Sequence, residues 1–177
     1  VLRNMQRGET SNSIRSLYKK IKEICPDIAL RTTLILGHPG ETETDFSELL
    51  EFIKEIRFDR LGAFTYSDED GTSAYNLKNK VEQNNAIERK NIIMELQQEI
   101  SREKNEELID TEQVVRIDKY DPSNQCYIGR TYRDAPEIDN EVIIKRYLFQ
   151  ESKIGSLQKF IITDAAEYEL YGKFLSE

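Results

Sequence analysis

The chain has 177 residues, 38% of them hydrophobic, which is enough for one ordinary domain or two small ones with real cores. Its 33 acidic and 25 basic residues give a net charge of −8, which argues against a general nucleic-acid binder but leaves room for a local basic patch. The apolar runs are far shorter than the roughly 20 residues of a membrane helix, and the first residues lack the pattern of a secretory signal. We therefore expect a globular, cytoplasmic protein with no membrane segment.

The first 110 residues alternate between helix and strand patterns. Apolar residues at helical spacing predict helices over 14–24, 46–56 and 84–108, and apolar runs predict strands over 28–37 and 60–67. The near-continuous hydrophobicity of the first strand suits a parallel strand that is covered on both faces. The order helix, strand, helix, strand, helix is that of an α/β barrel, which two strands cannot close. Because the chain also lacks an initiator Met, we expect it to be the second half of a barrel whose other strands lie upstream.

The helical patterns carry further detail. Thr42 and Asp45 resemble a capping box at the start of the second helix, and Pro26 closes the first. The apolar positions expected to face the core are Phe46, Leu49, Leu50, Ile53 and Ile56 in the second helix, and Ile87, Ile93, Leu96, Ile100 and Leu108 in the third.

From about residue 111 the pattern changes to short alternating runs separated by turn residues. The expected strands cover residues 114–117, 127–132, 141–144, 160–163 and 168–171. Five short strands in this length predict a small antiparallel barrel. The expected fold class is therefore α/β plus all-β: residues 1–110 form a partial α/β barrel, residues 111–177 form a five-stranded antiparallel β-barrel, and their two cores are separate on either side of residues 109–112.

The two cysteines, Cys25 and Cys126, are too far apart for a metal-ligand motif or a disulfide framework. Each continues an apolar pattern, so we predict that both are small buried side chains in a reduced protein. Two thiols cannot hold an iron–sulfur cluster, and we predict that the chain alone binds none.

Two loops follow the carboxyl ends of the expected parallel strands, where α/β barrels bind their ligands: residues 37–41 and 67–72. The glycines of the first loop allow a close backbone approach to a ligand, and the start of the next helix offers N–H groups to an anion, although such turns also serve as plain connections. A structural role is favoured for His38, which has no nucleophilic partner nearby. Glu41 suits the helix start or a ligand equally well, and the acidic run in the second loop also suits a solvated turn.

Read together, several motifs resemble the radical S-adenosylmethionine methylthiotransferase family in order and spacing, over nearly the whole chain. They are Val1-Leu2-Arg3-Asn4-Met5-Gln6-Arg7-Gly8, Arg31 to Thr42, Phe64-Thr65-Tyr66-Ser67 with Gly71-Thr72 and Ala74-Tyr75, Gly129 to Asp139, and Tyr168-Glu169-Leu170-Tyr171-Gly172. The last two resemble the family's C-terminal TRAM domain. The resemblance implies the second half of a radical S-adenosylmethionine barrel over residues 1–110 and a substrate-recognising TRAM barrel over residues 111–177.

The resemblance also implies cofactors: S-adenosylmethionine and two 4Fe-4S clusters in the full-length enzyme, one of which cleaves S-adenosylmethionine reductively to a 5′-deoxyadenosyl radical. The cysteines that hold these clusters are not in this sequence, so we expect the chain alone to be inactive, with no catalytic residue and no metal ligand. His38 stands where the family commonly has Phe. The residues that the resemblance places at the S-adenosylmethionine pocket are Arg31, Gly37, Pro39, Gly40 and Glu41, and for Arg31 a structural salt bridge is an equal alternative.

The family modifies either tRNA adenosine or an aspartate of a small-subunit ribosomal protein. The tRNA enzymes typically carry Ser-Ser-Asp and Pro-Arg-Pro where this chain has Arg31-Thr32-Thr33 and Asp68-Glu69-Asp70, so the resemblance is closer to the ribosomal-protein branch. Residues 112–177 hold nine basic and twelve acidic residues, a net charge of −3. This balance argues against a tRNA substrate and against a non-catalytic nucleic-acid-binding barrel, the two alternatives.

The expected substrate contacts lie in two segments. They are Ser67, Thr72, Arg130, Arg133, Asp134, Glu137 and Asp139. The mixed charges of residues 130–139 suit the surface of a basic ribosomal protein, so we expect a loop of that protein to dock between this segment and residues 67–72. The plain alternative for residues 130–139 is a solvated turn.

Overall fold

The computed structural model describes Val1, Met5, residues 7–146 and residues 152–175, so most of the Val1 to Gly8 motif lies outside the described residues. The chain divides into two compact units, Val1–Gln97 and Gln98–Glu177, which are described one at a time. A domain boundary between residues 110 and 111 stays a prediction. Within the described part of the chain, no helix is long and apolar enough to cross a membrane.

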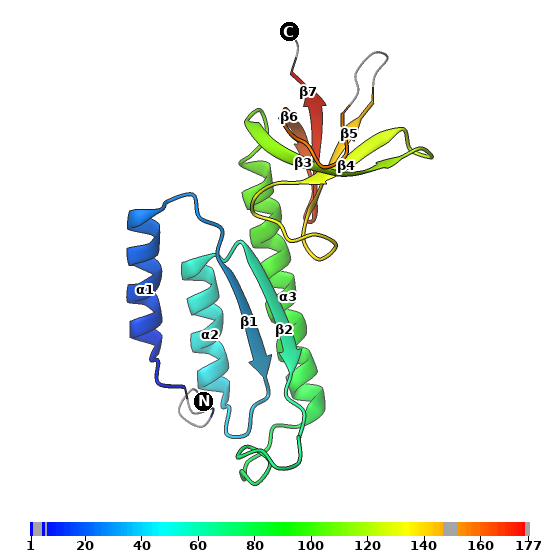
Figure 1. The fold of residues 1–177 in the computed structure, drawn as a ribbon. Helices are drawn as coiled ribbons and strands as arrows, with labels where there is room; N and C mark the ends of the chain where they lie inside the picture. Colours follow the sequence, from blue (N-terminus) through cyan, green and yellow to red (C-terminus); the bar gives the residue numbers. More distant parts are fainter. Residues whose placement is uncertain (2–4, 6, 147–151, 176–177) are drawn as a thin grey trace. The chain divides into compact units, whose positions relative to one another are not determined.

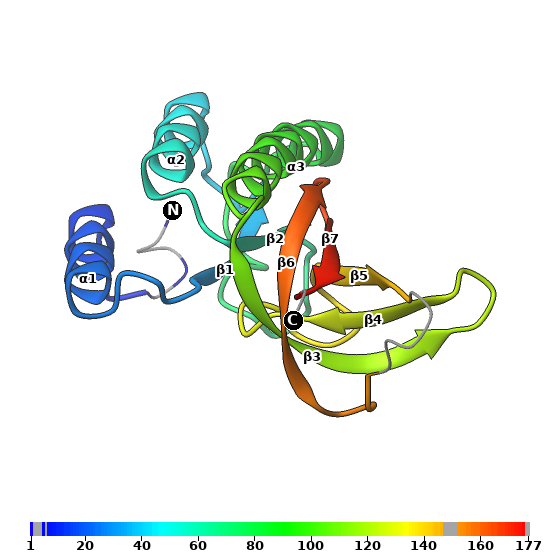
Figure 2. The same cartoon turned by 90° about the horizontal axis from the view of Figure 1, so that it is seen from above.

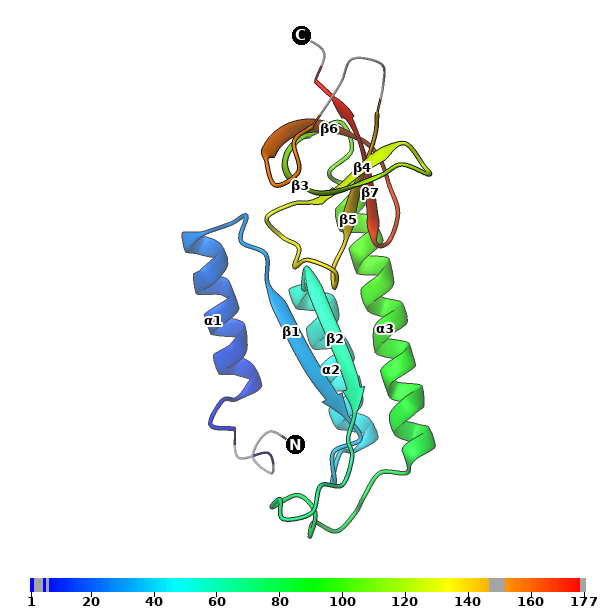
Figure 3. The same cartoon turned by 45° about the vertical axis from the view of Figure 1, so that its right-hand side comes forward.

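The first unit is built on two parallel strands. It contains α1 (Ser11–Ile24), β1 (Arg31–Leu36), α2 (Glu43–Ile56), β2 (Arg60–Thr65) and the first part of α3 (Gln83–Glu106). Strands β1 and β2 pair in parallel from Arg31 opposite Arg60 to Leu36 opposite Thr65, as the α/β pattern predicts. Both strands therefore end at the same edge of the sheet, where the segment leading to α3 begins (Figures 1 and 3).

Among the described residues, only one face of this sheet is buried. Leu36 is fully buried and Leu61 nearly so, whereas Ile35 and Phe64, on the opposite face, are 42% and 62% exposed. The prediction that β1 is covered on both faces is therefore wrong for this chain. Phe46, Ile53 and Ile56 of α2 are buried, as predicted from the helical spacing.

Two capping boxes start the first two helices. Thr42 and Asp45 form the one predicted for α2, with the Thr42 hydroxyl accepting from the Asp45 N–H at 3.1 Å and the Asp45 carboxylate accepting from the Thr42 N–H at 2.9 Å. Thr10 and Ser13 make the same reciprocal contact at α1. Cys25, directly after α1, is exposed, so the prediction of a buried thiol is wrong there. Cys126 is buried as predicted, and this burial raises its pKa.

The buried face of α3 is more polar than its apolar pattern suggested. Ile93 and Ile100 are buried as predicted, but Ile87 is 41% exposed. The remaining buried positions at helical spacing are Ala86, Arg89, Gln97, Ser101 and Asn105. Near the start of α3, the periodicity of apolar residues alone therefore predicted the wrong buried face. Polar side chains such as that of Arg89 occupy buried positions there, and an apolar pattern does not include them.

The second unit is a closed five-stranded barrel that forms behind the end of α3. Its strands are β3 (Glu112–Asp121), β4 (Cys126–Arg130), β5 (Glu141–Lys145), β6 (Leu157–Ala165) and β7 (Glu169–Phe174), in the order β3-β4-β5-β7-β6 (Figure 2). The five predicted strands are confirmed, but the fully antiparallel arrangement is wrong, since β5 and β7 pair in parallel. A closed ring with an odd number of strands cannot alternate direction all the way round, so one parallel pair is unavoidable.

The barrel interior is apolar and includes Leu108, two residues after the end of α3. The buried cluster consists of Leu108, Val115, Ile117, Tyr127, Val142, Ile144, Phe160, Ile162 and Leu170. In β3, β5, β6 and β7 these positions alternate with half-buried or exposed ones, which is the pattern expected of a barrel filled by side chains. Two side chains near the end of α3 fix the β6–β7 turn: the Ser101 hydroxyl donates to the Glu167 carbonyl at 2.7 Å, and the Asn105 amide donates to the Ala166 carbonyl at 2.8 Å.

Candidate functional site

A cleft of about 430 Å³ lies at the carboxyl ends of β1 and β2. Its lining comes from both predicted loops and from the segment that enters α3: Gly37, Thr65, Tyr66, Ser67, Asp68, Lys80, Val81 and Gln83. The structure thus brings Gly37 and Ser67, two of the predicted site residues, to one cleft. It also adds Lys80, Val81 and Gln83, which sequence reasoning missed because they lie in an irregular stretch without a recognisable pattern.

Charged and phenolic groups of the cleft contact one another. The Asp68 carboxylate pairs with the Lys80 ammonium and accepts a hydrogen bond from the Tyr66 hydroxyl at 3.0 Å. The hydrogen bond from Lys80 lowers the pKa of Asp68, and burial followed by the Asp68 contact raises the pKa of Tyr66. Near neutral pH the cleft therefore presents a carboxylate, an ammonium and a protonated phenol. The ammonium also lies 5.1 Å from the centroid of the Tyr75 ring, a cation–π contact.

The turn after β1 needs its glycines for contacts within the chain. Gly37 has φ +79°, and a Cβ added to it would lie 2.5 Å from the Cβ of Ala86 on α3. Gly40 has φ +87° and donates its N–H to the Asn79 carbonyl at 2.9 Å. His38 is buried, with its ring 5.4 Å from that of Tyr66 in an edge arrangement, which fits the structural role favoured for it. Within the chain, Gly37 thus closely approaches α3 and Gly40 contacts the segment before it.

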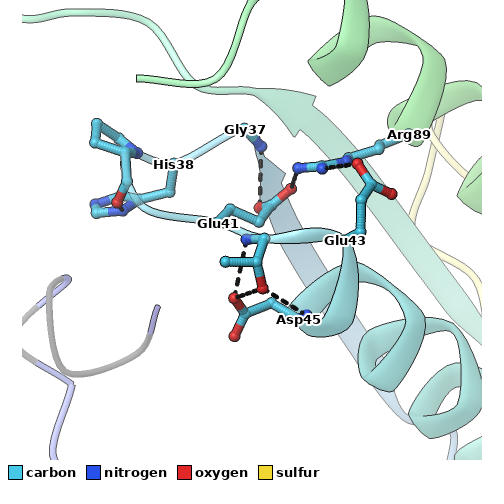
Figure 4. A network of polar contacts seen from close by, with 8 residues as sticks. Gly37, His38, Glu41, Glu43, Asp45 and Arg89 are labelled. Carbon is cyan, nitrogen blue, oxygen red and sulfur yellow. Dashed lines mark hydrogen bonds and ion pairs between the residues drawn. The ribbon is translucent and has the colours of Figure 1, made fainter. Parts of the chain in front are cut away.

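Glu41 and Arg89 join this turn to α3 (Figure 4). One Glu41 carboxylate oxygen accepts from the Gly37 N–H at 3.0 Å, and the other accepts from the Arg89 guanidinium at 2.6 Å. The same guanidinium pairs with Glu43. Burial opposes the charge of Arg89, yet the contacts with Glu43 and Glu41 raise the pKa of Arg89 above its usual value. These contacts of Glu41, with the turn and with α3, differ from both roles considered from the sequence, the helix start and a ligand.

The start of α2 is poorly suited to an anion. The Asp45 N–H donates to the Thr42 hydroxyl, so the capping box already uses it. Glu43 and Asp45 also place two carboxylates in the first turn. The N-terminal anion site considered from the sequence is therefore disfavoured, because these charges repel an anion where the helix dipole would attract one.

The remaining predicted residues of this unit lie apart from the cleft. Arg31 begins β1, whose remaining five residues separate it from Gly37 by about 20 Å at the usual rise per residue. The structure does not bring Arg31 to the turn with which it was grouped. Thr72 donates its hydroxyl to the Glu69 carbonyl at 2.8 Å and is not part of the cleft lining.

In the barrel unit, the predicted contact segment 130–139 turns many of its polar groups inward. Arg130 donates to the Asp118 carboxylate at 2.5 Å, and Asp134, which is buried, accepts from the Thr131 hydroxyl at 2.7 Å. Asp139 accepts from the Ala135 N–H at 2.8 Å. Three of the five residues predicted to meet a substrate thus hold the segment together. Its exposed residues are Tyr132, Pro136, Glu137 and Ile138, with Arg133 half-buried beside the Tyr132 ring.

Comparison with known proteins finds relatives over both units. Residues 110–175 match the TRAM domain family. Across 99% of its length the chain is 44% identical to a protein of Christiangramia forsetii, 43% to one of Cytophaga hutchinsonii and 41% to one of Geobacter sulfurreducens, each named ribosomal protein uS12 methylthiotransferase RimO. Over nearly its whole length the chain is thus similar to methylthiotransferases. It spans 38–39% of the length of these three relatives, and the resemblance of its motifs to this family is confirmed.

The iron–sulfur clusters implied by the similarity to methylthiotransferases do not fit the two cysteines of this chain. Cys25 is exposed after α1, and Cys126 is buried in β4 of the TRAM barrel. Among the residues that the structure describes, no three His, Cys, Asp or Glu side chains are grouped to hold a metal ion. The cleft does suit an adenosyl amino acid, because its size and its mixture of aromatic, charged and backbone groups are those of a small-molecule site.

Proposed function

We propose that this chain belongs to an enzyme that transfers a methylthio group to an aspartate of ribosomal protein uS12. The chain contributes a wall of the S-adenosylmethionine site and the substrate-binding TRAM domain. The observation that carries the proposal is the shared name of eight relatives, 38–44% identical over nearly the whole chain, all called ribosomal protein uS12 methylthiotransferase RimO.

The cleft at the ends of β1 and β2 is the proposed contact with S-adenosylmethionine. When bound and cleaved reductively, that cofactor supplies a 5′-deoxyadenosyl radical. The residues proposed to shape its site are Gly37, Pro39 and Gly40 from the first turn, with Tyr66, Lys80 and Gln83 as hydrogen-bonding groups. The Lys80 ammonium could bind the carboxylate of the cofactor, and the Asp68 carboxylate could bind its amino or sulfonium cation. The charged pair therefore suits the amino-acid end of the cofactor.

The exposed part of segment 130–139 is the proposed contact with uS12. Tyr132 and Ile138 are 63% and 74% exposed, and Arg133 lies with its guanidinium 5.5 Å from the Tyr132 ring centroid. Tyr and Arg are the residues that most often dominate the affinity of protein interfaces. The net charge of −3 over residues 112–177 favours a basic protein partner over the phosphates of tRNA.

The substrate assignment is tested by binding of the whole enzyme to uS12 and to tRNA at two salt concentrations. We expect Tyr132→Ala or Ile138→Ala to weaken uS12 binding about tenfold, as removal of an interface anchor does. Leu175→Ala is the matched control. Leu175 is also an exposed apolar side chain, 37% exposed, but it follows β7 and does not belong to segment 130–139. Tighter and steeply salt-dependent binding to tRNA would move the protein to the tRNA-modifying branch.

A further inference from the structure

Arg89 is an unusual residue for the buried face of a helix. Its side chain is only 7% exposed, and that of its partner Glu41 is 5% exposed. The second partner, Glu43, is 82% exposed. A buried ion pair gains little net stability over apolar packing, because both charges lose their hydration. The pair therefore calls for a role other than stability alone.

The guanidinium is held from three directions. It donates to Glu41 at 2.6 Å, it pairs with Glu43, and its central carbon lies 5.4 Å from the centroid of the Phe46 ring. A planar fork with several donors can bridge two carboxylates at once, which the single ammonium of a lysine does less well. The position of the guanidinium on α3 is thus fixed, and with it the position of the Glu41 carboxylate.

Glu41 transmits this position to the cleft. Its second oxygen accepts the Gly37 N–H at 3.0 Å, and Gly37 belongs to the cleft lining (Figure 4). Ala86, one helical turn before Arg89, lies against the same glycine. The segment leading to α3 adds a third anchor, since the Asn79 carbonyl accepts the Gly40 N–H at 2.9 Å. The backbone of the turn is therefore set by residues 79–89.

We propose that Arg89 is a positioning residue for the S-adenosylmethionine site: through the Glu41 carboxylate it holds the Gly37 amide and so fixes the wall of the cleft. The inference rests on the proposed function for the identity of the ligand. Arg89 itself does not line the cleft, so its effect on the ligand is indirect.

The test uses the whole enzyme and two measurements: hydrogen exchange of the Gly37 amide without ligand, and the Kd for S-adenosylmethionine. For Arg89→Met we expect Gly37 exchange about tenfold faster and S-adenosylmethionine binding about tenfold weaker, the usual size for loss of a charged hydrogen bond. Binding of uS12 should be unchanged. Glu43→Gln is the control, because it removes only the exposed partner, and it should leave both measurements within about twofold of wild type.

Each outcome bears on the proposal. If Arg89→Met folds and keeps both the slow Gly37 exchange and the wild-type Kd, even with a lowered melting temperature, Arg89 is merely structural and the proposal fails. If Arg89→Met does not fold, Arg89→Lys takes its place, with intermediate values of both quantities expected and wild-type values overturning the proposal. If the wild-type enzyme binds no S-adenosylmethionine while Arg89→Met still loosens Gly37, the positioning role holds and the proposed function fails.

Discussion

Comparing Gly37 with Gly71 separates two contributions of a glycine to stability, its left-handed backbone conformation and the close packing around it. Both have φ +79°, but an added Cβ meets Ala86 at 2.5 Å only at Gly37, and nothing within 4 Å at Gly71. Gly71→Ala should lower the free energy of unfolding by about 1 kcal/mol, the cost of a left-handed conformation. Gly37→Ala should cost a further 1–3 kcal/mol or so from overpacking. Chemical denaturation measures both, and equal losses would show that the contact with Ala86 yields easily.

The two capping boxes differ in one titratable group, which gives a prediction about pH. Hydrogen bonds from the side chain and backbone of Thr42 lower the pKa of Asp45. A carboxyl whose pKa is lower in the folded state stabilises the fold above its ordinary pKa and loses that contribution as the pH falls through the folded value. Asp45→Ala should therefore cost about 1 kcal/mol near neutral pH and progressively less below about pH 4.

Ser13→Ala at α1 is the matched control for this prediction. Ser13 occupies the same third helical position as Asp45, and its hydroxyl accepts the Thr10 N–H at 2.8 Å, but it carries no charge. The loss of unfolding free energy caused by Ser13→Ala should be the same on both sides of pH 4. A parallel pH dependence in the two variants would mean that the titration of Asp45 is not its source.

Among the elements, α3 shows what the sequence predicts and what it does not. The extent of the helix was predicted within two residues, because apolar spacing reports helix length well. Its buried polar side chains were missed, because their partners come from distant parts of the chain: Gln97 donates to the Phe58 carbonyl and Ser101 to the Glu167 carbonyl. Nothing in the local pattern of the helix indicates that such partners exist.

The barrel strands contain two glycines that differ in how tightly their backbone is packed. A Cβ at Gly129 in β4 would lie 2.3 Å from the Arg116 carbonyl oxygen in β3, whereas at Gly172 in β7 its nearest neighbours are at 3.5 Å. Because a backbone atom cannot move aside, Gly129→Ala should lower the free energy of unfolding by about 3 kcal/mol, the upper end of the usual cost of overpacking. Gly172→Ala should change the free energy of unfolding by less than about 1 kcal/mol. Thermal unfolding of the two variants compares them, and a tolerated Gly129→Ala would show that β3 and β4 can separate without loss of the barrel.

At the scale of the whole molecule, the sequence predicted an α/β part and a five-stranded barrel, and both are present. The predicted direction of one strand pair was wrong, because local alternation defines a strand but not its partner. The candidate site was predicted in part: strand ends located the loops with Gly37 and Ser67, but Lys80 and Gln83 reach the cleft from a segment without periodicity. Residues 130–139 stay a predicted contact segment, and the sequence did not indicate which of their charged side chains turn inward.

The central proposal is that this chain is part of an enzyme that methylthiolates ribosomal protein uS12. The most direct test is the mass of uS12 purified from cells that carry the gene and from cells that lack it, with tRNA nucleosides measured in parallel. We predict that uS12 loses the mass of one methylthio group at an aspartate when the gene is absent, and that the whole gene restores it, while the tRNA nucleosides are the same in both strains. An unchanged uS12 mass together with loss of a methylthiolated adenosine from tRNA would contradict the account.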